Sequence, residues 1–173
     1  MLHRVTDPAA HMARWLRLLK VEGFAMFSCL GPGSLAGLRE VYQRHGWGAA
    51  AQGFLDMHDL GDMLVQVGFA DPVMDQETLT LTWDSPLALL AELRGLGGNA
   101  SAARLPGLRT PRWRARLLQA LEALVGPDGR LRLDFEIVYG HAFKAAPRMA
   151  VASTTRIGMD ALRAHLRGPQ GRP

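Results

Sequence analysis

Apolar side chains recur every three or four positions near the start of the chain and predict its first helix. The series consists of Met12, Trp15, Leu16 and Leu19. Asp7-Pro8 stands just before it, and aspartate favours the capping position of a helix while proline is tolerated in the first turn. The pattern therefore predicts a helix that covers residues 8–20.

A continuous apolar run follows and predicts the first strand. Phe24–Leu30 contains no charged residue, and a run of this kind is typical of a strand buried on both faces of a parallel sheet. Gly31-Pro32-Gly33 ends the strand, and Ser34 is placed to cap a helix over residues 34–44. We therefore expect a central strand with helices before and after it.

The rest of the chain alternates between helical and extended patterns. Helical patterns cover residues 59–67, 85–96, 111–125 and, near the end, 159–166. Apolar and polar residues alternate over 73–83 and 131–139 and predict two more strands. Residues 46–53 are rich in glycine and alanine and predict a mobile loop. Three strands separated by helices predict an α/β protein with a narrow sheet.

Length and composition are those of one globular domain without a membrane segment. The chain has 173 residues, of which 48% are hydrophobic and 21% are charged. Its longest apolar runs are far shorter than the ~20 residues that span a membrane, and its start lacks the pattern of a secretory leader. The single cysteine, Cys29, cannot form an internal disulfide. These features favour a protein of the cytoplasm.

Charge is distributed unevenly along the chain. Residues 1–103 carry 7 basic and 11 acidic side chains, whereas residues 104–173 carry 13 basic and 5 acidic ones. Because a surface of one sign attracts the opposite sign, the candidate partners are nucleic acid, a phosphorylated cofactor and a small acidic protein. A solvated arginine-rich surface without a partner is the alternative. The densest basic cluster consists of Arg104, Arg109, Arg112, Arg114 and Arg116.

The turn after the first strand matches the short motif of dinucleotide-binding loops. Residues 31–36 read G-x-G-x-x-A between an apolar strand and a helix, where glycines let a backbone approach a phosphate. Pro32 removes an amide donor from such a cradle. The acidic residue expected about 20 positions later would be Asp56, which follows a loop rather than a strand. The motif therefore favours a strand-to-helix turn over a nucleotide site.

Two further groups of side chains resemble parts of metal or catalytic sites. His58 and Asp62 are four residues apart, as metal-binding pairs on a helix can be, but nearby Asp59 fits a helix cap. Cys29 lies in an apolar strand and lacks the surroundings of a nucleophile. His141 follows the last strand and could face a cleft. We expect neither a metal site nor covalent catalysis.

Several longer segments resemble one family of enzymes. They are FSCLGPGSLAGLR at 27–39, FLDMHDLGD at 54–62, GFADPVMD at 68–75, LRGLGGNA at 93–100 and EIVYGHAF at 136–143. Together they resemble the malonyl-acyl-carrier-protein O-methyltransferases of biotin synthesis, in which the first segment follows the fifth strand and the last forms the final strand. The resemblance extends from the start of the chain to about residue 145.

The resemblance implies the C-terminal half of a class I methyltransferase, residues 1–146, followed by a basic, flexible tail at 147–173. Such a sheet has seven strands with the last one antiparallel, and residues 85–125 would form a helical insertion that covers the substrate. The family uses S-adenosylmethionine to methylate the free carboxylate of a malonyl thioester. The thioester is carried by acyl carrier protein, a small acidic partner that the arginine cluster could dock. The family's glycine-rich cofactor loop precedes the matched segments, so the resemblance assigns this chain no cofactor-binding motif.

The resemblance places the substrate at the end of the first strand. The candidate residues are Ser28, Leu30, Gly31 and Pro32, followed by Tyr139 and His141. Their alternative role is ordinary packing and turn formation. Methyl transfer to a carboxylate needs positioning and removal of water rather than proton transfer, and the sequence contains no proton-shuttling triad. The family usually has an Asn-Arg pair where this chain has Gln52-Gly53.

A second hypothesis is a non-catalytic module that is truncated or split from such an enzyme. It would bind an acidic carrier, an N-terminal partner half, or a second copy of itself. A sheet without its fourth strand exposes an edge that favours such association. A third hypothesis, nucleic-acid binding, rests only on the basic segment 104–173, which carries no recognised reader motif.

Overall fold

The computed structural model describes residues 2, 5–147 and 159–160, and its helices and strands follow one another in the predicted order. The strands are β1 (Phe24–Leu30), β2 (Ala70–Trp83) and β3 (Leu131–Phe143). The helices are α1 (Pro8–Leu18), α2 (Ala36–Arg44), α3 (Met57–Val67), α4 (Pro86–Gly95) and α5 (Pro111–Glu122). The predicted insertion is present as α4 and α5 between β2 and β3. Nearly all of the expected tail, including most of the helix predicted over 159–166, lies outside the described residues.

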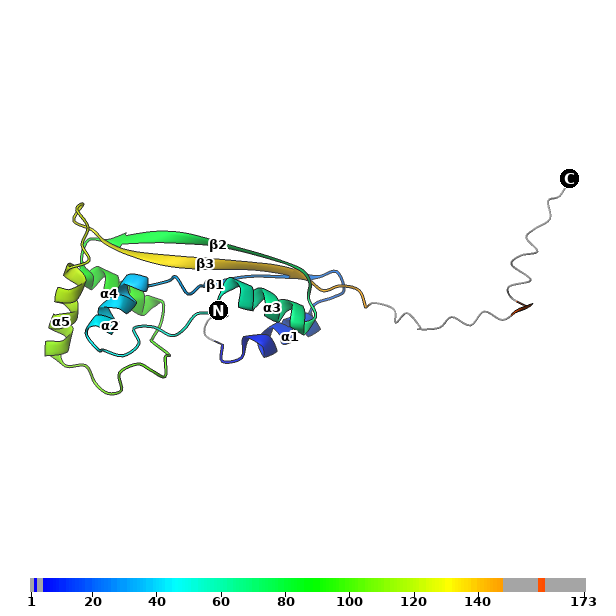
Figure 1. Ribbon diagram of the computed structural model, residues 1–173, viewed down its shortest axis with the longest axis horizontal. Helices are drawn as coiled ribbons and strands as arrows, with labels where there is room; N and C mark the ends of the chain where they lie inside the picture. The colour runs from blue at the N-terminus through cyan, green and yellow to red at the C-terminus, as the bar shows by residue number, and fades with distance from the viewer. Residues whose placement is uncertain (1, 3–4, 148–158, 161–173) are drawn as a thin grey trace.

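The three strands form one sheet in which β3 lies between β1 and β2 and runs antiparallel to both (Figure 1). The register aligns Leu30 with Ile137. The prediction of a central β1 with parallel neighbours is wrong for the described chain, because β1 pairs with β3 alone. Its apolar run has one packed face and one open face: Cys29 is 6% exposed, whereas Met26 is 72% exposed.

The buried residues of β3 change from one face of the sheet to the other along the strand. Leu131, Leu133 and Phe135 are buried in its first half, and Val138 and Ala142 in its second. Because side chains alternate between the two faces, these sets lie on opposite sides. The first set packs with α2, α4 and α5, and the second with α1 and α3 at the other end of the sheet (Figure 1). The regular alternation over residues 131–139 predicts one solvent-exposed face along the whole strand, and this prediction is wrong.

Each face of the sheet also has an open half, and the two open halves differ in chemistry. In the open half of the face that carries α4 and α5, beyond the cavity-lining Leu79 and Leu81, five large side chains are between 38% and 72% exposed: Phe24, Met26, Val73, Tyr139 and Phe143. We call these five residues the open apolar face. The opposite face exposes Thr80, Thr82 and Asp134, which water can solvate. Only the open apolar face is therefore a surface that burial would stabilise.

Local sequence determines where most helices begin. Three helices start with a capping side chain followed by proline, at Asp7, Ser85 and Thr110. Each of these side chains accepts a hydrogen bond from the backbone N–H three residues later, at 2.9–3.2 Å. The expected cap of α3 at Asp59 is wrong, because Asp56 accepts the His58 N–H at 2.7 Å and begins the helix three residues earlier.

The loop at residues 46–53, expected to be mobile, packs against the insertion. Trp47 is 6% exposed, and its ring centroid lies 5.4 Å from that of Trp113 in α5. Gly48 has a φ of 73°, and a side chain there would place a Cβ atom 2.7 Å from the backbone nitrogen of Leu105. The Ala49 N–H donates to the Ala103 carbonyl at 3.0 Å. This glycine therefore serves a close approach between two backbone segments.

Candidate functional site

The end of β1 faces the insertion across a cavity of about 340 Å³. Two of the predicted substrate residues, Ser28 and Leu30, line it. Its other walls come from the sheet and from the helix that covers it: Leu79, Leu81 and Trp83 of β2, Phe135 and Ile137 of β3, and Glu92 and Leu93 of α4, with Leu96 after it. The predicted position at the end of β1 is thus hollow and mostly apolar, as a site for an apolar chain requires.

One acidic side chain lies in this apolar wall, and it is already paired. The Glu92 carboxylate accepts a hydrogen bond from the indole N–H of Trp83, which is 6% exposed. A hydrogen bond of this kind compensates the indole for the water lost on burial. Glu92 therefore fixes α4 against the end of β2 and shapes the cavity wall.

The glycine-rich turn after β1 is filled by a side chain of the protein itself. The Gly33 N–H donates to Oε2 of Glu136 at 3.1 Å. A Cβ atom on Gly31 would lie 2.1 Å from Oε1 of the same carboxylate, and one on Gly33 would lie 2.4 Å from Oε2. Glu136 thus occupies the place that a phosphate takes in a nucleotide-binding loop. This geometry agrees with the strand-to-helix turn that the sequence favours.

Ser34 fastens this turn to β3 instead of capping α2 as expected. Its side chain is fully buried, and its hydroxyl donates to the Glu136 carbonyl and accepts the Glu136 N–H, both at 3.0 Å. The helix instead begins after Leu35, whose φ of 61° is unusual for a branched residue and which makes no side-chain cap. The hydroxyl therefore substitutes for the strand pairing that β1 loses where it ends.

Arg39 of α2 holds the outer side of the same turn. Its Nη1 donates to the Pro32 carbonyl at 2.7 Å, and its Nη2 donates to the Gln52 carbonyl at 3.4 Å. Its guanidinium also lies 5.3 Å from the centre of the Phe54 ring. Arg39 therefore joins the Gly31-Pro32 turn to the segment where this chain has Gln52-Gly53.

The second-choice candidates, Tyr139 and His141, lie farther along the same face. Tyr139 is directly opposite Ser28 in the register, and its hydroxyl donates to the Glu77 carboxylate. This hydrogen bond raises the pKa of the Tyr139 phenol. His141 is opposite Met26, and its ring lies among the aromatic rings of the open apolar face. The structure thus brings Ser28, Leu30 and Tyr139 together and places His141 one step away.

Two more cavities continue from the first one along α4. The smaller, about 120 Å³, is lined by Leu30, Phe54 and Asn99 among others, and the larger, about 730 Å³, reaches the start of α5. Leu93 lines all three cavities. Asn99 lies between the smaller and larger ones, and its Nδ2 donates to the Ala49 carbonyl at 2.7 Å. The cavities therefore form one belt from the end of β1 to α5.

Arg109 lies in the wall of the largest cavity and differs from the other arginines of the predicted docking cluster. It is half-buried, and its guanidinium stacks 4.0 Å from the centre of the Trp113 ring and 5.7 Å from that of Tyr42. Its Nη1 and the Trp113 Nε1 are shielded from solvent and have no hydrogen-bond partner. Burial raises the pKa of the Tyr42 hydroxyl, and the positive charge of Arg109 partly opposes that shift.

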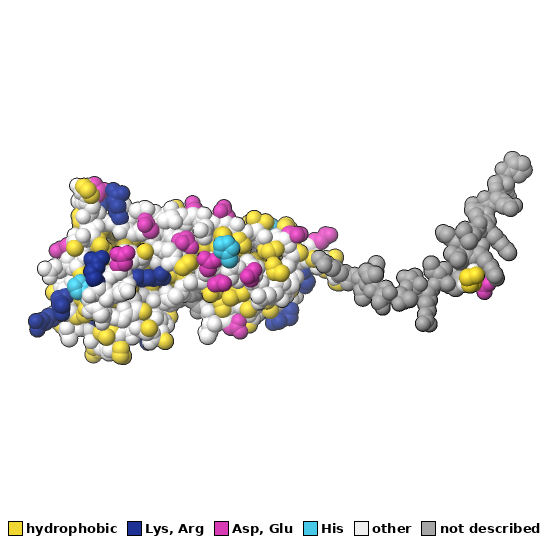
Figure 2. Space-filling view, in the orientation of Figure 1, with side chains coloured by type: hydrophobic (Ala, Val, Ile, Leu, Met, Phe, Trp, Pro, Cys, Tyr) yellow, Lys and Arg dark blue, Asp and Glu magenta, His cyan; other side chains and the backbone are white. Residues whose placement is uncertain are grey.

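The other four arginines of the cluster are exposed, but they do not share one surface. Arg112 and Arg116 are four residues apart and share one side of α5, whereas Arg114 between them points to the cavity side. Arg104 precedes the helix and donates to the Ser101 carbonyl at 3.0 Å. In Figure 2, basic side chains gather mainly at the end of the molecule that carries α5.

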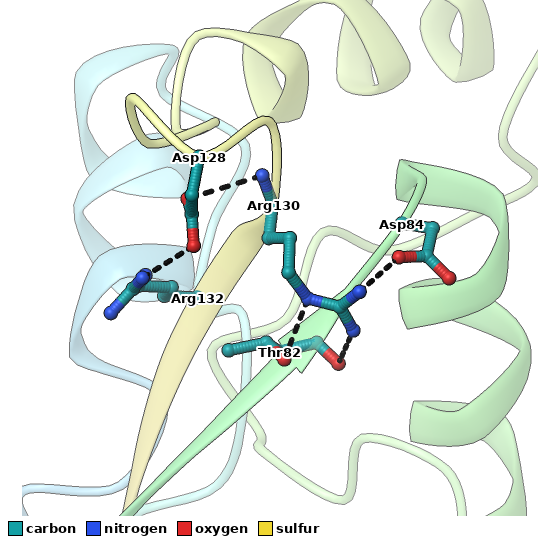
Figure 3. A network of polar contacts seen from close by, with 5 residues as sticks. All are labelled: Thr82, Asp84, Asp128, Arg130 and Arg132. Atoms are coloured by element: carbon teal, nitrogen blue, oxygen red, sulfur yellow. Dashed lines mark hydrogen bonds and ion pairs between the residues drawn. The ribbon is translucent and has the colours of Figure 1, made fainter.

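A polar network attaches the insertion to the sheet where β2 ends and β3 begins (Figure 3). Arg130 pairs with Asp84, just before α4, and its Nε donates to the Thr82 hydroxyl at 2.9 Å. Asp128 accepts hydrogen bonds from the Arg132 guanidinium and the Arg130 N–H, and the Arg132 bond lowers the pKa of this carboxyl. The network is exposed, so it orients the two segments more than it stabilises them.

Curated relatives match most of this chain. A malonyl-acyl-carrier-protein O-methyltransferase from Gallionella capsiferriformans is 48% identical over 134 residues, which are 77% of this chain and 46% of that protein. Proteins of the same name from Laribacter hongkongensis and Nitrosospira multiformis are 40% and 42% identical over 85% and 78% of this chain, and 50% and 44% of those proteins. Over most of its length the chain is therefore similar to malonyl-acyl-carrier-protein O-methyltransferases. It spans about half the length of the relatives it matches.

The fold agrees with this family. The crystal structure of a candidate methyltransferase from Bacillus halodurans superposes with a TM-score of 0.50 over 84% of this chain and 61% of that one, at 14% identity. No protein-family model matches the chain. The predicted α/β class, with a last strand antiparallel to its neighbours and a helical insertion before it, is confirmed.

In the described part of the chain, no group of three or more His, Cys, Asp or Glu side chains is placed to hold a metal ion. His58 Nδ1 lies 2.8 Å from Oδ1 of Asp56, the cap of α3. None of the helices that the structure describes is long and apolar enough to cross a membrane.

Sequence reasoning did not find three residues that shape the surroundings of the end of β1: Arg39, Glu92 and Glu136. Glu136 contacts a turn more than a hundred residues earlier in the sequence, so no local pattern could reveal it. Arg109 was grouped with surface arginines. One signal in the sequence could have distinguished Arg109 from the surface arginines. Arg109 precedes α5 and stands four residues before Trp113, so its guanidinium can stack on the Trp113 ring once the helix forms.

Proposed function

We propose that this chain forms the substrate-binding half of an O-methyltransferase that acts on the free carboxylate of a malonyl thioester held by acyl carrier protein. The supporting observation is the 48% identity to a protein of that name over 77% of the chain. We place the substrate in the cavity at the end of β1, which Ser28 and Leu30 line. The cytoplasm is the compartment proposed with this function, on the basis of the composition.

The proposed work of the residues at the end of β1 is positioning and exclusion of water. Leu79, Leu81 and Leu93 give the cavity an apolar lining that accommodates the uncharged part of a thioester. A carboxylate stripped of water near Ser28 and the Gly31-Pro32 turn is a better nucleophile than a hydrated one, because its hydration shell no longer has to be displaced. The reaction as proposed requires no proton to be transferred by a side chain.

S-Adenosylmethionine, the methyl donor expected for such an enzyme, does not fit the glycine-rich turn of this chain. The Glu136 carboxylate fills the turn, and a second anionic or polar group would displace it. We therefore assign the cofactor site to the part of the relatives that this chain does not match. When bound there, the cofactor would supply the methyl group.

The carrier protein would dock on exposed arginines of the insertion. Arg112 and Arg116 share one side of α5, and Arg104 is exposed nearby in sequence. Exposed charges of one sign speed association with an acidic partner and make it sensitive to salt. In this proposal Arg109 and Arg114, which line the cavity, take no part in docking.

Completing the chain with the unmatched N-terminal residues of the Gallionella capsiferriformans relative tests the function. The measurement is transfer of a labelled methyl group from adenosylmethionine to malonyl-acyl carrier protein, with acetyl-acyl carrier protein as the control substrate. We expect methyl ester from the completed protein with the malonyl substrate alone, and none from the 173-residue chain. A completed, folded protein that makes no ester would overturn the proposal, and adenosylmethionine binding by the chain alone in calorimetry would overturn the cofactor assignment.

A second candidate function is a non-catalytic module that binds an N-terminal half supplied by another chain. The open apolar face and the unpaired outer edge of β1 favour it, because both would be buried by further sheet and helix. Titration of the isolated N-terminal half into the chain separates the two functions. A tight complex that makes methyl ester supports the enzyme, whereas a tight complex without activity supports the module.

A further inference from the structure

The wall of the largest cavity contains two buried hydrogen-bond donors without acceptors. They are Nη1 of Arg109 and Nε1 of Trp113, each shielded from solvent. Both residues line the 730 Å³ cavity between α4 and α5. Donors that lose water on burial normally find an acceptor, because an unmet buried group is costly, and a charged one most of all. Their joint presence at one cavity marks a place where an acceptor is missing.

The guanidinium is held in place by its surroundings. It stacks on the Trp113 ring at 4.0 Å and lies 5.7 Å from the Tyr42 ring. The Trp113 ring in turn packs edge-on against Tyr42 and Trp47. A planar cation packed against aromatic rings presents its N–H groups in a restricted geometry, which suits recognition of a planar or tetrahedral oxyanion.

The electrostatic surroundings of the cavity are positive. Arg94 and Arg114 line it together with Arg109, and no aspartate or glutamate is among its lining residues. The start of α5, at Thr110 and Pro111, also borders it, and the N-terminal end of a helix carries a partial positive charge. Three guanidinium groups without a carboxylate favour a ligand with negative charge.

We propose that this cavity is a binding site for a carboxylate or phosphate group of an extended ligand, with Arg109 and Trp113 as its hydrogen-bond donors. The ligand's remaining length follows the belt of cavities past Leu93 toward Leu30. Identification of that ligand as the carrier-bound thioester rests on the proposed function, whereas anion binding by the cavity does not. A carboxylate would come from an acyl group, and a phosphate from the arm that joins the acyl group to its carrier.

The test is a titration of the ¹⁵N-labelled 173-residue chain with malonate and, separately, with inorganic phosphate at constant ionic strength. The readout is the indole N–H resonance of Trp113, assigned by its loss in Trp113→Phe. We expect this resonance to shift with either or both anions. Arg109→Gln should weaken the affinity by about tenfold or more, because a charge-assisted pair is lost. Arg17→Gln, an equal change of charge on exposed α1, should alter it by less than about twofold.

Arg109→Lys is a second variant that distinguishes loss of the site from a failure to fold. It keeps the positive charge and loses the planar guanidinium. With far-ultraviolet circular dichroism unchanged, its affinity should lie between those of the parent chain and Arg109→Gln. A tighter response to malonate identifies the carboxylate source, and a tighter response to phosphate identifies the phosphate source.

An unmoved Trp113 resonance with both anions at tens of millimolar would overturn the site, as would equal weakening by Arg109→Gln and Arg17→Gln. The titration contains neither methyl donor nor carrier. Its failure therefore leaves the methyltransferase proposal standing, and the failure of methyl transfer leaves the anion site standing.

Discussion

At the scale of single residues, Glu136 changes the meaning of the glycine-rich turn. The two glycines are required because a carboxylate from β3 occupies the space beside them. Pro32 has no backbone N–H, and this is tolerated because the turn does not have to donate to a ligand at that position. A motif that resembles a phosphate cradle is therefore an internal contact between β1 and β3. The same argument separates Arg109 from its neighbours, because burial and stacking give it a role that charge alone does not.

Gly31→Ala tests the contact with Glu136. The new methyl group would displace the carboxylate and lose its hydrogen bond to Gly33, so we expect a loss of about 1–2 kcal/mol in the free energy of unfolding. Urea denaturation followed by circular dichroism measures it. In a Glu136→Ala background the same change should cost less than about 0.5 kcal/mol. Gly53→Ala, which has open space around its Cβ position, is the control. Equal costs in both backgrounds would contradict the assignment.

Cys29 serves as a reporter of folding. It is 6% exposed, and burial raises the pKa of its thiol, so the folded protein presents little reactive thiolate. At pH 8 we expect iodoacetamide to modify the folded chain at least about tenfold more slowly than the chain in denaturant. The rate should rise with pH in both states and remain slower in the folded one. Similar rates in the two states would show that β1 is open to solvent.

At the scale of elements, the two edge strands of the sheet are protected differently. β2 carries Asp71, Pro72, Asp75 and Glu77 near its start, and charges and proline discourage pairing with another strand. β1 has no charged residue and no proline. This difference explains why the sequence predicted a central β1: its composition is that of a strand with neighbours on both sides. The described chain provides only one of them.

The cap of α5 is a local feature that sequence identifies and that supports the anion cavity. Thr110→Ala removes the side chain that accepts the Trp113 N–H at 3.1 Å, and we expect a loss of about 1 kcal/mol in the free energy of unfolding. Thr110→Ser retains the hydroxyl and should retain most of the stability. Thermal and urea denaturation compare the three proteins. Equal losses in both variants would mean that the threonine methyl group, not the cap, stabilises this end of α5.

The elements themselves were predictable because their signals are local. Asp7-Pro8, Ser85-Pro86 and Gly68 mark helix ends through hydrogen bonds within a few residues, and the structure confirms them. The arrangement of the strands was not predictable in the same way. The apolar run of β1 indicates that the strand is buried, but it does not indicate which neighbour buries it. The buried residues of β3 change from one face of the sheet to the other because different helices pack on the two faces. Ser34 shows the same limit, because its hydroxyl bonds to Glu136, about a hundred residues later in the sequence.

At the scale of the whole molecule, the open apolar face and the unprotected edge of β1 lie at the same end of the sheet. Phe24 and Met26 belong to both. The opposite face is open over threonines and Asp134, so water covers it without penalty. A surface with these properties favours association, whether with a partner half or with a second copy.

Met26→Glu tests this surface. We expect the parent chain to associate as its concentration rises, and the buried charge in the variant to weaken that association by at least about tenfold. Sedimentation velocity over a concentration series gives the measurement. Val65→Glu, at a 57% exposed position on α3, is the matched control and should associate like the parent. A parent chain that stays monomeric at every concentration would refute the prediction.

The central place of β3 also determines the order of events during synthesis. β1 and β2 form no hydrogen bonds with each other. Each pairs only with β3, which begins at Leu131. At the ribosome's pace of roughly 5–20 residues per second, β1 remains unpaired for several seconds after it emerges. Its uncharged edge is then available to other nascent chains. We therefore expect slower translation between β1 and β3 to lower the yield of this chain in cells, and chaperones that shield β1 during that interval to raise it.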